Sequence, residues 1–138
     1  SAILINGSQQ VIYDPAGTFR HSTAPRADDV NYGMHPGLVR VYKSFHARFG
    51  YHVVSQEMQV SREFADRVLA RAIEVGTTPK LFCANSTSQV LNTFPEFAAI
   101  PTTFYPGKLM NRFSELAGVV TTYTYEEDEG KNYAALNN

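Results

Sequence analysis

The chain has 138 residues, of which 43% are hydrophobic and 12% aromatic, a composition typical of one globular domain with its own core. Its 12 basic and 13 acidic residues give a formal net charge of −1 with no basic tract, which argues against a dedicated nucleic-acid surface. No apolar run reaches the length of a membrane span, and one cysteine excludes an internal disulfide or a cysteine-rich zinc site.

The first predicted elements are two short β-prone runs, residues 2–5 and 11–13. Asn6-Gly7 between them predicts a hairpin, because both residues tolerate positive φ. The chain starts directly in a strand and without an initiator methionine, so we expect residues upstream of Ser1.

Asp14 directly precedes a proline, which ends the second strand because proline cannot continue a ladder. Residues 18–36 are rich in proline, glycine and polar side chains, and they predict a long surface loop that borders a binding site. Apolar spacing then predicts a helix over residues 37–48 and a strand over residues 51–60.

Ser61 is a predicted N-cap for a helix that stops at Gly76, and a further helix begins near Cys83. The last predicted elements are a helix over residues 107–116 and a strand over residues 119–125. Together they predict an α+β domain with a mostly antiparallel sheet packed against helices. The other predictions on organisation are a single domain over residues 1–125 and an acidic, then polar, C-terminal tail over residues 126–138.

The single cysteine stands where an apolar loop leads into a helix, in the stretch PKLFCANST. The first turn of a helix offers unpaired backbone N–H groups and the positive end of the helix dipole, and both favour a thiolate over a thiol. Cys83 is therefore a candidate nucleophile. The alternative is a small, buried, apolar side chain, since free cysteine is among the most buried residue types.

A thiol nucleophile needs a base within hydrogen-bond reach, and the base needs an orienting partner. His21, in the predicted loop 18–36, is the candidate base. Asp14 is either a turn-forming residue or the carboxylate that fixes a histidine tautomer. Of the remaining histidines, we expect His35 at the start of a helix, His46 at the solvated edge of a helix and His52 in a strand.

The order of elements from the opening hairpin to VSREFA at residues 60–65, the helix to Gly76 and FCANST at residues 82–87 resembles a known superfamily. This is the circularly permuted branch of the NlpC-like, papain-like cysteine peptidases and amidases, which includes bacterial envelope hydrolases and proteins similar to lecithin–retinol acyltransferase. In that branch, strands with the histidine and its polar partner precede the helix with the cysteine. The resemblance covers roughly residues 1–93 and implies a permuted papain-like architecture.

The resemblance implies that Cys83 is the nucleophile and that Asp14, on the second strand, is the third member of the site. The family carries its histidine at the head of the first strand, immediately before Ser1. Three alternatives follow for this chain: the base lies directly upstream of the given sequence, His21 replaces it from the loop, or the site is inactive.

The implied activity is that of a thiol-dependent hydrolase or acyltransferase, which cleaves an amide bond through a Cys thioester without a metal or organic cofactor. The expected substrate is peptidoglycan or a peptide, with an N-acyl lipid as the alternative. The competing hypothesis is a non-catalytic structural or binding module on the same scaffold, assembled into a larger complex. An envelope-associated protein or a phage particle component would be such a module, and both hypotheses suggest the bacterial cell envelope or a phage particle as the location.

Overall fold

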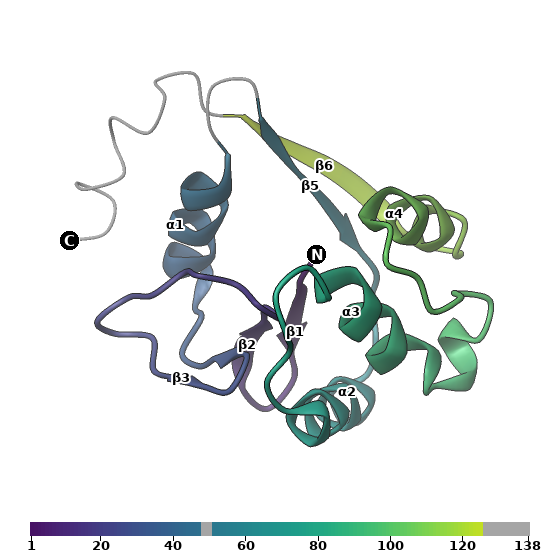
Figure 1. Ribbon diagram of the computed structural model, residues 1–138, viewed down its shortest axis with the longest axis horizontal. Helices are drawn as coiled ribbons and strands as arrows, with labels where there is room; N and C mark the ends of the chain where they lie inside the picture. The colour runs from purple at the N-terminus through teal and green to yellow at the C-terminus, as the bar shows by residue number, and fades with distance from the viewer. Residues whose placement is uncertain (48–50, 126–138) are drawn as a thin grey trace.

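The structure, a computed structural model, describes residues 1–47 and 51–125, so the predicted tail over residues 126–138 lies outside the described residues. Figure 1 shows the arrangement of the elements. In chain order they are β1 (Ile3–Asn6), β2 (Gln10–Tyr13), β3 (Arg26–Ala27), β4 (Val30–Asn31), α1 (Pro36–His46), β5 (His52–Glu57), α2 (Arg62–Val75), α3 (Cys83–Asn92), the 3-10 helix η1 (Pro95–Phe97), α4 (Pro106–Ser114) and β6 (Val120–Tyr125). Among these residues the fold is α+β, with antiparallel sheets and four α-helices, as the sequence predicted.

The predicted hairpin is confirmed, and its turn is hydrogen-bonded to helix α2. β1 and β2 pair antiparallel up to Asn6 and Gln10, so that residues 7–9 form a three-residue connection. The Ser8 backbone N–H and hydroxyl both donate to the Asp66 carboxylate of α2, at 2.8 and 2.6 Å. These two bonds lower the pKa of Asp66 from its ordinary value. The hairpin is therefore tied to the helix it packs against.

β2 has buried side chains on both of its faces. Val11 and Tyr13 belong to the larger core cluster, together with side chains of α2 and α3. Ile12 points the other way, into a second cluster with Met34 and Leu38. Since helices cover both faces of the sheet, β2 has a continuous apolar run instead of an alternating pattern.

Residues 18–36 differ from the predicted surface loop. They contain β3 and β4, which extend the sheet in the order β1-β2-β4-β3. Phe19 and Met34 in this segment are fully buried. Each of the two strands has only two residues, so neither produces a period that a sequence can reveal.

The helix boundaries follow the predicted capping signals. The Ser61 hydroxyl accepts a hydrogen bond from the backbone N–H of Phe64 at 3.1 Å, a cap worth about 1 kcal/mol. Gly76 ends α2 with a φ of 71°, in the left-handed region that favours glycine. At the start of α1, the His35 ring accepts from the N–H groups of Gly37 and Leu38, so His35 is a helix cap.

A second sheet consists of β5 and β6, paired antiparallel from His52 and Tyr125 to Glu57 and Val120. In Figure 1 this two-stranded ribbon runs past the first hairpin, between α1 at one end and α4 at the other. Within the residues described, none of the helices has both the length and the apolar character needed to cross a membrane.

Candidate functional site around Cys83

Cys83 is the first residue of α3 and is half-buried. Its Sγ lies 3.4 Å from the amino nitrogen of Ser1, at the head of β1. Figure 1 shows the start of the chain beside the amino end of α3. Phe82, the residue that precedes α3, makes no side-chain cap hydrogen bond, so among the described residues this end of the helix lacks a side-chain cap.

Two buried hydroxyls hold α3 in place behind the cysteine. The Ser86 hydroxyl accepts from the Thr78 hydroxyl at 2.9 Å, which ties the helix to the loop that precedes it. The Ser88 hydroxyl accepts from the backbone N–H of Thr103 at 3.0 Å, which ties the helix to the segment that leads into α4. The position of Cys83 is therefore set by the helix and by both neighbouring loops.

Asp14, the predicted third member, is buried at the end of β2. Burial raises the pKa of its carboxyl above the ordinary aspartate value, while His46, Arg26 and a hydrogen bond from Tyr42 act against that rise. A Cβ at Gly17 would collide with the Asp14 carboxyl, so the turn that follows β2 is shaped around this side chain.

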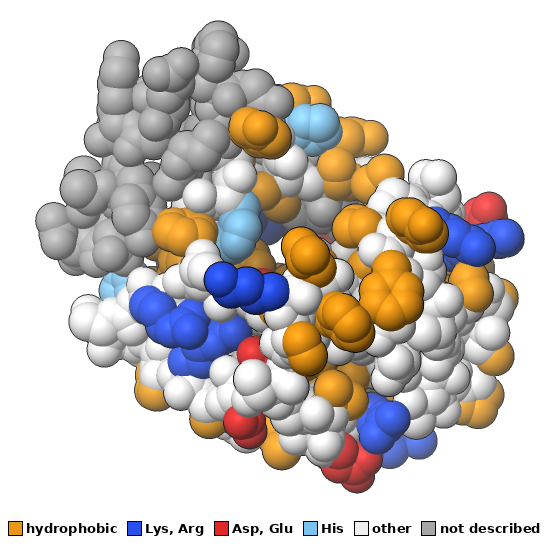
Figure 2. All heavy atoms as spheres, in the orientation of Figure 1, with side chains coloured by type: hydrophobic (Ala, Val, Ile, Leu, Met, Phe, Trp, Pro, Cys, Tyr) orange, Lys and Arg blue, Asp and Glu red, His pale blue; other side chains and the backbone are white. Residues whose placement is uncertain are grey.

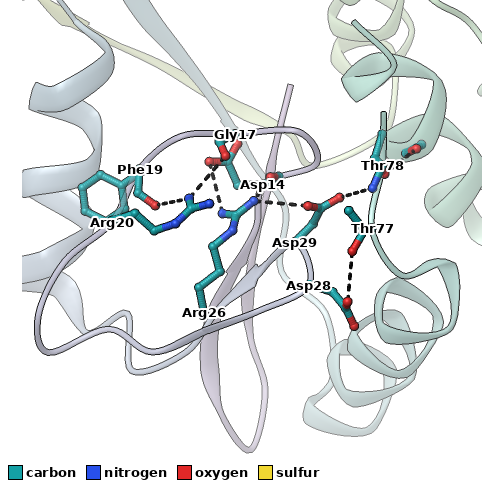
Figure 3. A network of polar contacts seen from close by, with 10 residues as sticks. Asp14, Gly17, Phe19, Arg20, Arg26, Asp28, Asp29, Thr77 and Thr78 are labelled. Carbon is teal, nitrogen blue, oxygen red and sulfur yellow. Dashed lines mark hydrogen bonds and ion pairs between the residues drawn. The ribbon is translucent and has the colours of Figure 1, made fainter. Parts of the chain in front are cut away.

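Arg26 connects Asp14 to a second buried aspartate, as Figure 3 shows. Arg26 Nη2 donates to the Asp14 carbonyl at 2.9 Å and to Asp29 Oδ1 at 3.2 Å, and its Nη1 lies 3.8 Å from Asp14 Oδ2. Asp29 Oδ2 accepts from the backbone N–H of Thr78 at 2.7 Å. The network therefore runs from the end of β2 to the loop that precedes α3 and Cys83.

Tyr42 and His46, both on α1, lie near Asp14 and line the same groove. His46 is exposed near the end of the helix, as the sequence predicted, whereas Tyr42 was not predicted as a site residue. Burial raises the pKa of Tyr42 well above its ordinary value, and the Asp14 carboxylate and a Cys83 thiolate raise it further. The rings of Tyr42 and His46 lie 4.3 Å apart between centroids. Their spacing of four residues on a predicted helix was the sequence signal that could have found them.

The ring nitrogens distinguish His46 from His21 as a base. His46 Nδ1 lies 3.0 Å from the Tyr42 carbonyl oxygen, which can only accept, so Nδ1 carries the proton and Nε2 keeps a lone pair. His21 Nδ1 instead accepts from the Thr23 backbone N–H at 3.2 Å, so its lone pair is already engaged. His21 also stacks on Phe19, and its described contacts lie within its own loop.

A groove of about 880 Å³ lies between the first hairpin and the β5–β6 sheet. Ser1, Asp14, Tyr42, His46 and His52 are among the side chains that line it. Cys83 lies beside the groove, since its sulfur touches the Ser1 nitrogen at the groove's wall. The structure thus places Asp14 in the wall of the groove and Cys83 next to that wall, while His21 is not among the residues that line it.

No three histidine, cysteine, aspartate or glutamate side chains gather into a metal-binding group within residues 1–47 and 51–125. The groove and its edge nevertheless offer the Asp14 carboxyl, the His46 imidazole and the Tyr42 hydroxyl in the wall, with the Cys83 thiol next to it. That set provides a nucleophile and groups that hold or move protons.

Comparison with protein-family models, curated proteins and solved structures found no match for the chain in any of the three.

Replacing Asp14 with asparagine is expected to change how stability depends on pH. Because the native pKa of Asp14 is raised, the folded chain holds this proton more tightly than the unfolded chain does. The free energy of unfolding therefore falls as pH rises from the ordinary aspartate pKa, near 3.9, through the raised native value. Urea unfolding of both proteins across this range should show a decline in the parent that is absent in Asp14→Asn. Parallel pH profiles would contradict a raised pKa at Asp14.

Proposed function

We propose that the chain is a thiol-dependent hydrolase or acyltransferase of the permuted NlpC-like architecture, with Cys83 as its nucleophile and a peptide amide as its substrate. The observation that carries the proposal is the 3.4 Å contact between Cys83 Sγ and the head of β1. That superfamily holds its histidine at the head of this strand, next to the cysteine of the following helix. The buried carboxyl of Asp14 beside the same groove supports the third position.

In the proposed reaction, a histidine takes the Sγ proton of Cys83, and the thiolate attacks the amide carbonyl carbon. A C–S bond forms, and the carbonyl oxygen becomes an oxyanion that the N–H groups of the uncapped first turn of α3 stabilise. The C–N bond then breaks as the histidine returns its proton to the departing amine. Water or an amine or hydroxyl acceptor then attacks the thioester while the histidine takes its proton. A new C–O or C–N bond forms, the C–S bond breaks, and the proton passes to the departing thiolate, which regenerates the Cys83 thiol.

The base is proposed at one of three positions. The resemblance implies a histidine at the head of β1, and the Ser1 nitrogen at 3.4 Å marks how close that position is to the sulfur. His46 lines the groove and has a ring nitrogen with a free lone pair. His21, the base expected from the loop, needs a different tautomer and a rearrangement of its loop.

A chain that carries one histidine immediately before Ser1 tests the architecture. We expect this addition to raise the rate of iodoacetamide alkylation of Cys83 at neutral pH by at least about tenfold, because a neighbouring imidazole draws off the thiol proton. Hydrolysis of peptidoglycan fragments and of activated peptide esters should rise with it. The control is a chain with one alanine before Ser1.

The same assays on His46→Ala and His21→Ala identify the base in the chain as given. If the alkylation rate of Cys83 depends on His46 but not on the added histidine, the result would identify His46 on α1 as the base. Equal alkylation by all variants, at the rate of Cys83 in the unfolded chain, would contradict the enzyme proposal and favour the non-catalytic module.

A further inference from the structure

An exposed apolar surface surrounds the amino end of α3, and its side chains come from two loops. We call it the apolar rim, and it consists of Leu81, Phe82, Phe104 and Tyr105, which are 88%, 41%, 52% and 72% exposed. The rings of Phe82 and Phe104 meet edge to face with their centroids 5.1 Å apart, so the two loops form one surface. Figure 2 shows apolar side chains gathered on this face, where Figure 1 draws the start of α3 and the segment before α4. A continuous exposed patch of large apolar side chains marks an interaction surface.

The backbone conformation of Leu81 is a second, independent indication that its exposed side chain is functional. The Phe82 N–H donates to the Pro79 carbonyl at 3.2 Å, which closes a tight turn with Leu81 as its third residue. Leu81 has a φ of 71°, a conformation for which such turns favour glycine. The chain therefore holds a leucine at the tip of a turn, in a strained conformation and almost fully in solvent. Strain of this kind concentrates at sites where a side chain is needed in one position.

The charged residues nearest the apolar rim in sequence are basic, and an exposed carboxylate contact of the first loop, that of Asp28 with Thr77, lies four residues before Leu81. Residues 77–95 and 101–114 contain Lys80, Lys108 and Arg112 and no acidic residue. Arg112 is paired with Glu115 at 3.7 Å, which leaves the two lysines as the charges nearest the rim in sequence. The complementary partner is therefore apolar at its centre and negative at its surface.

We propose that the apolar rim docks the protein on the surface of a lipid bilayer that contains anionic headgroups. Leucine and aromatic side chains that project from loop tips suit insertion at the boundary between headgroups and acyl chains, while lysines reach up to the phosphates. Docking in this way holds the amino end of α3 against the bilayer, and it does not depend on Cys83 being a nucleophile.

Vesicle sedimentation with the full chain tests the proposal. We expect binding to vesicles of equal parts phosphatidylcholine and phosphatidylglycerol, and much weaker binding to phosphatidylcholine alone. Leu81→Gly should weaken binding by about tenfold or more, because it removes a side chain that the bilayer buries. Lys80→Gln and Lys108→Gln should each weaken it by about fivefold at low salt.

Two further measurements separate docking from folding and from catalysis. Leu81→Gly places glycine where the turn favours it, so its melting temperature should not fall while its binding does. Ile73→Ala, at a half-exposed apolar position on α2, and Cys83→Ala should both bind vesicles like the parent. Absence of binding to anionic vesicles, or binding that Leu81→Gly and Phe104→Ser leave unchanged, would overturn the proposal. Self-association in solution that the same two variants abolish would also overturn it, in favour of an interface between copies.

Discussion

Replacing Cys83 with alanine is expected to lower amide and ester hydrolysis by at least about a thousandfold, because the covalent route needs the sulfur. The same change should lower the free energy of unfolding by less than about 1 kcal/mol, since the side chain is half-buried at a helix start and lies outside both core clusters. The measurements are hydrolysis of peptidoglycan fragments and activated esters, together with urea unfolding of both proteins.

Two additional experiments support the interpretation of that result. Incubation of the parent protein with an activated peptide ester should yield an acyl adduct on Cys83 in intact-mass spectra, and Cys83→Ala should yield none. A matched control is Ser86→Ala, which changes a buried hydroxyl of the same helix. That variant should lose stability because it removes the acceptor of the Thr78 hydroxyl, yet keep the acyl adduct. Full hydrolytic activity in Cys83→Ala would refute the thioester mechanism.

Replacing Asp29 with asparagine is expected to have the largest effect on stability, a loss of about 3 kcal/mol. Both Asp29 oxygens accept hydrogen bonds, from Arg26 Nη2 at 3.2 Å and from the Thr78 N–H at 2.7 Å. An amide has only one oxygen, so its NH₂ group would face one of these donors in a buried site. Arg26 would also lose one of its two anionic partners. In a chain of this length the change should lower the melting temperature by roughly 10 °C.

Asp28→Asn is the matched control, because it makes the same chemical change one residue earlier. Asp28 is exposed and accepts a hydrogen bond from the Thr77 hydroxyl, and asparagine tolerates its positive φ of 51°. Its unfolding free energy should therefore stay within about 0.5 kcal/mol of the parent. Similar losses in the two variants would contradict a special role for the buried network. Because Asp29 holds the loop before α3, only Asp29→Asn should also alter the alkylation rate of Cys83.

The helices and the hairpin could be predicted because their signals are local. Ser61 caps α2 and Gly76 ends it, and each acts within one helical turn of its own position. The start of α3 at Cys83 could likewise be predicted from the apolar loop and the small polar residues that follow. The sequence was therefore sufficient to place the Cys83 sulfur at the amino end of a helix.

The remainder of the site depends on contacts between distant residues. Asp28 and Asp29 look alike in the sequence, and only the packing of the loop near Thr78 distinguishes the exposed carboxylate from the buried one. The sequence alone could not distinguish the ring nitrogens of His46 from those of His21. The preference for His46 comes from the Tyr42 carbonyl and the Thr23 N–H, whose positions fix which ring nitrogen holds a proton.

The turn after β2 couples two positions that differ in chemistry. The carboxyl of Asp14 fills the space that any side chain at Gly17 would need, and this carboxyl is buried. Gly17→Ala would therefore displace the Asp14 carboxyl from its position, although the substitution itself alters no charge. In a library of random variants, we therefore expect larger residues at position 17 to appear only together with a smaller residue at position 14.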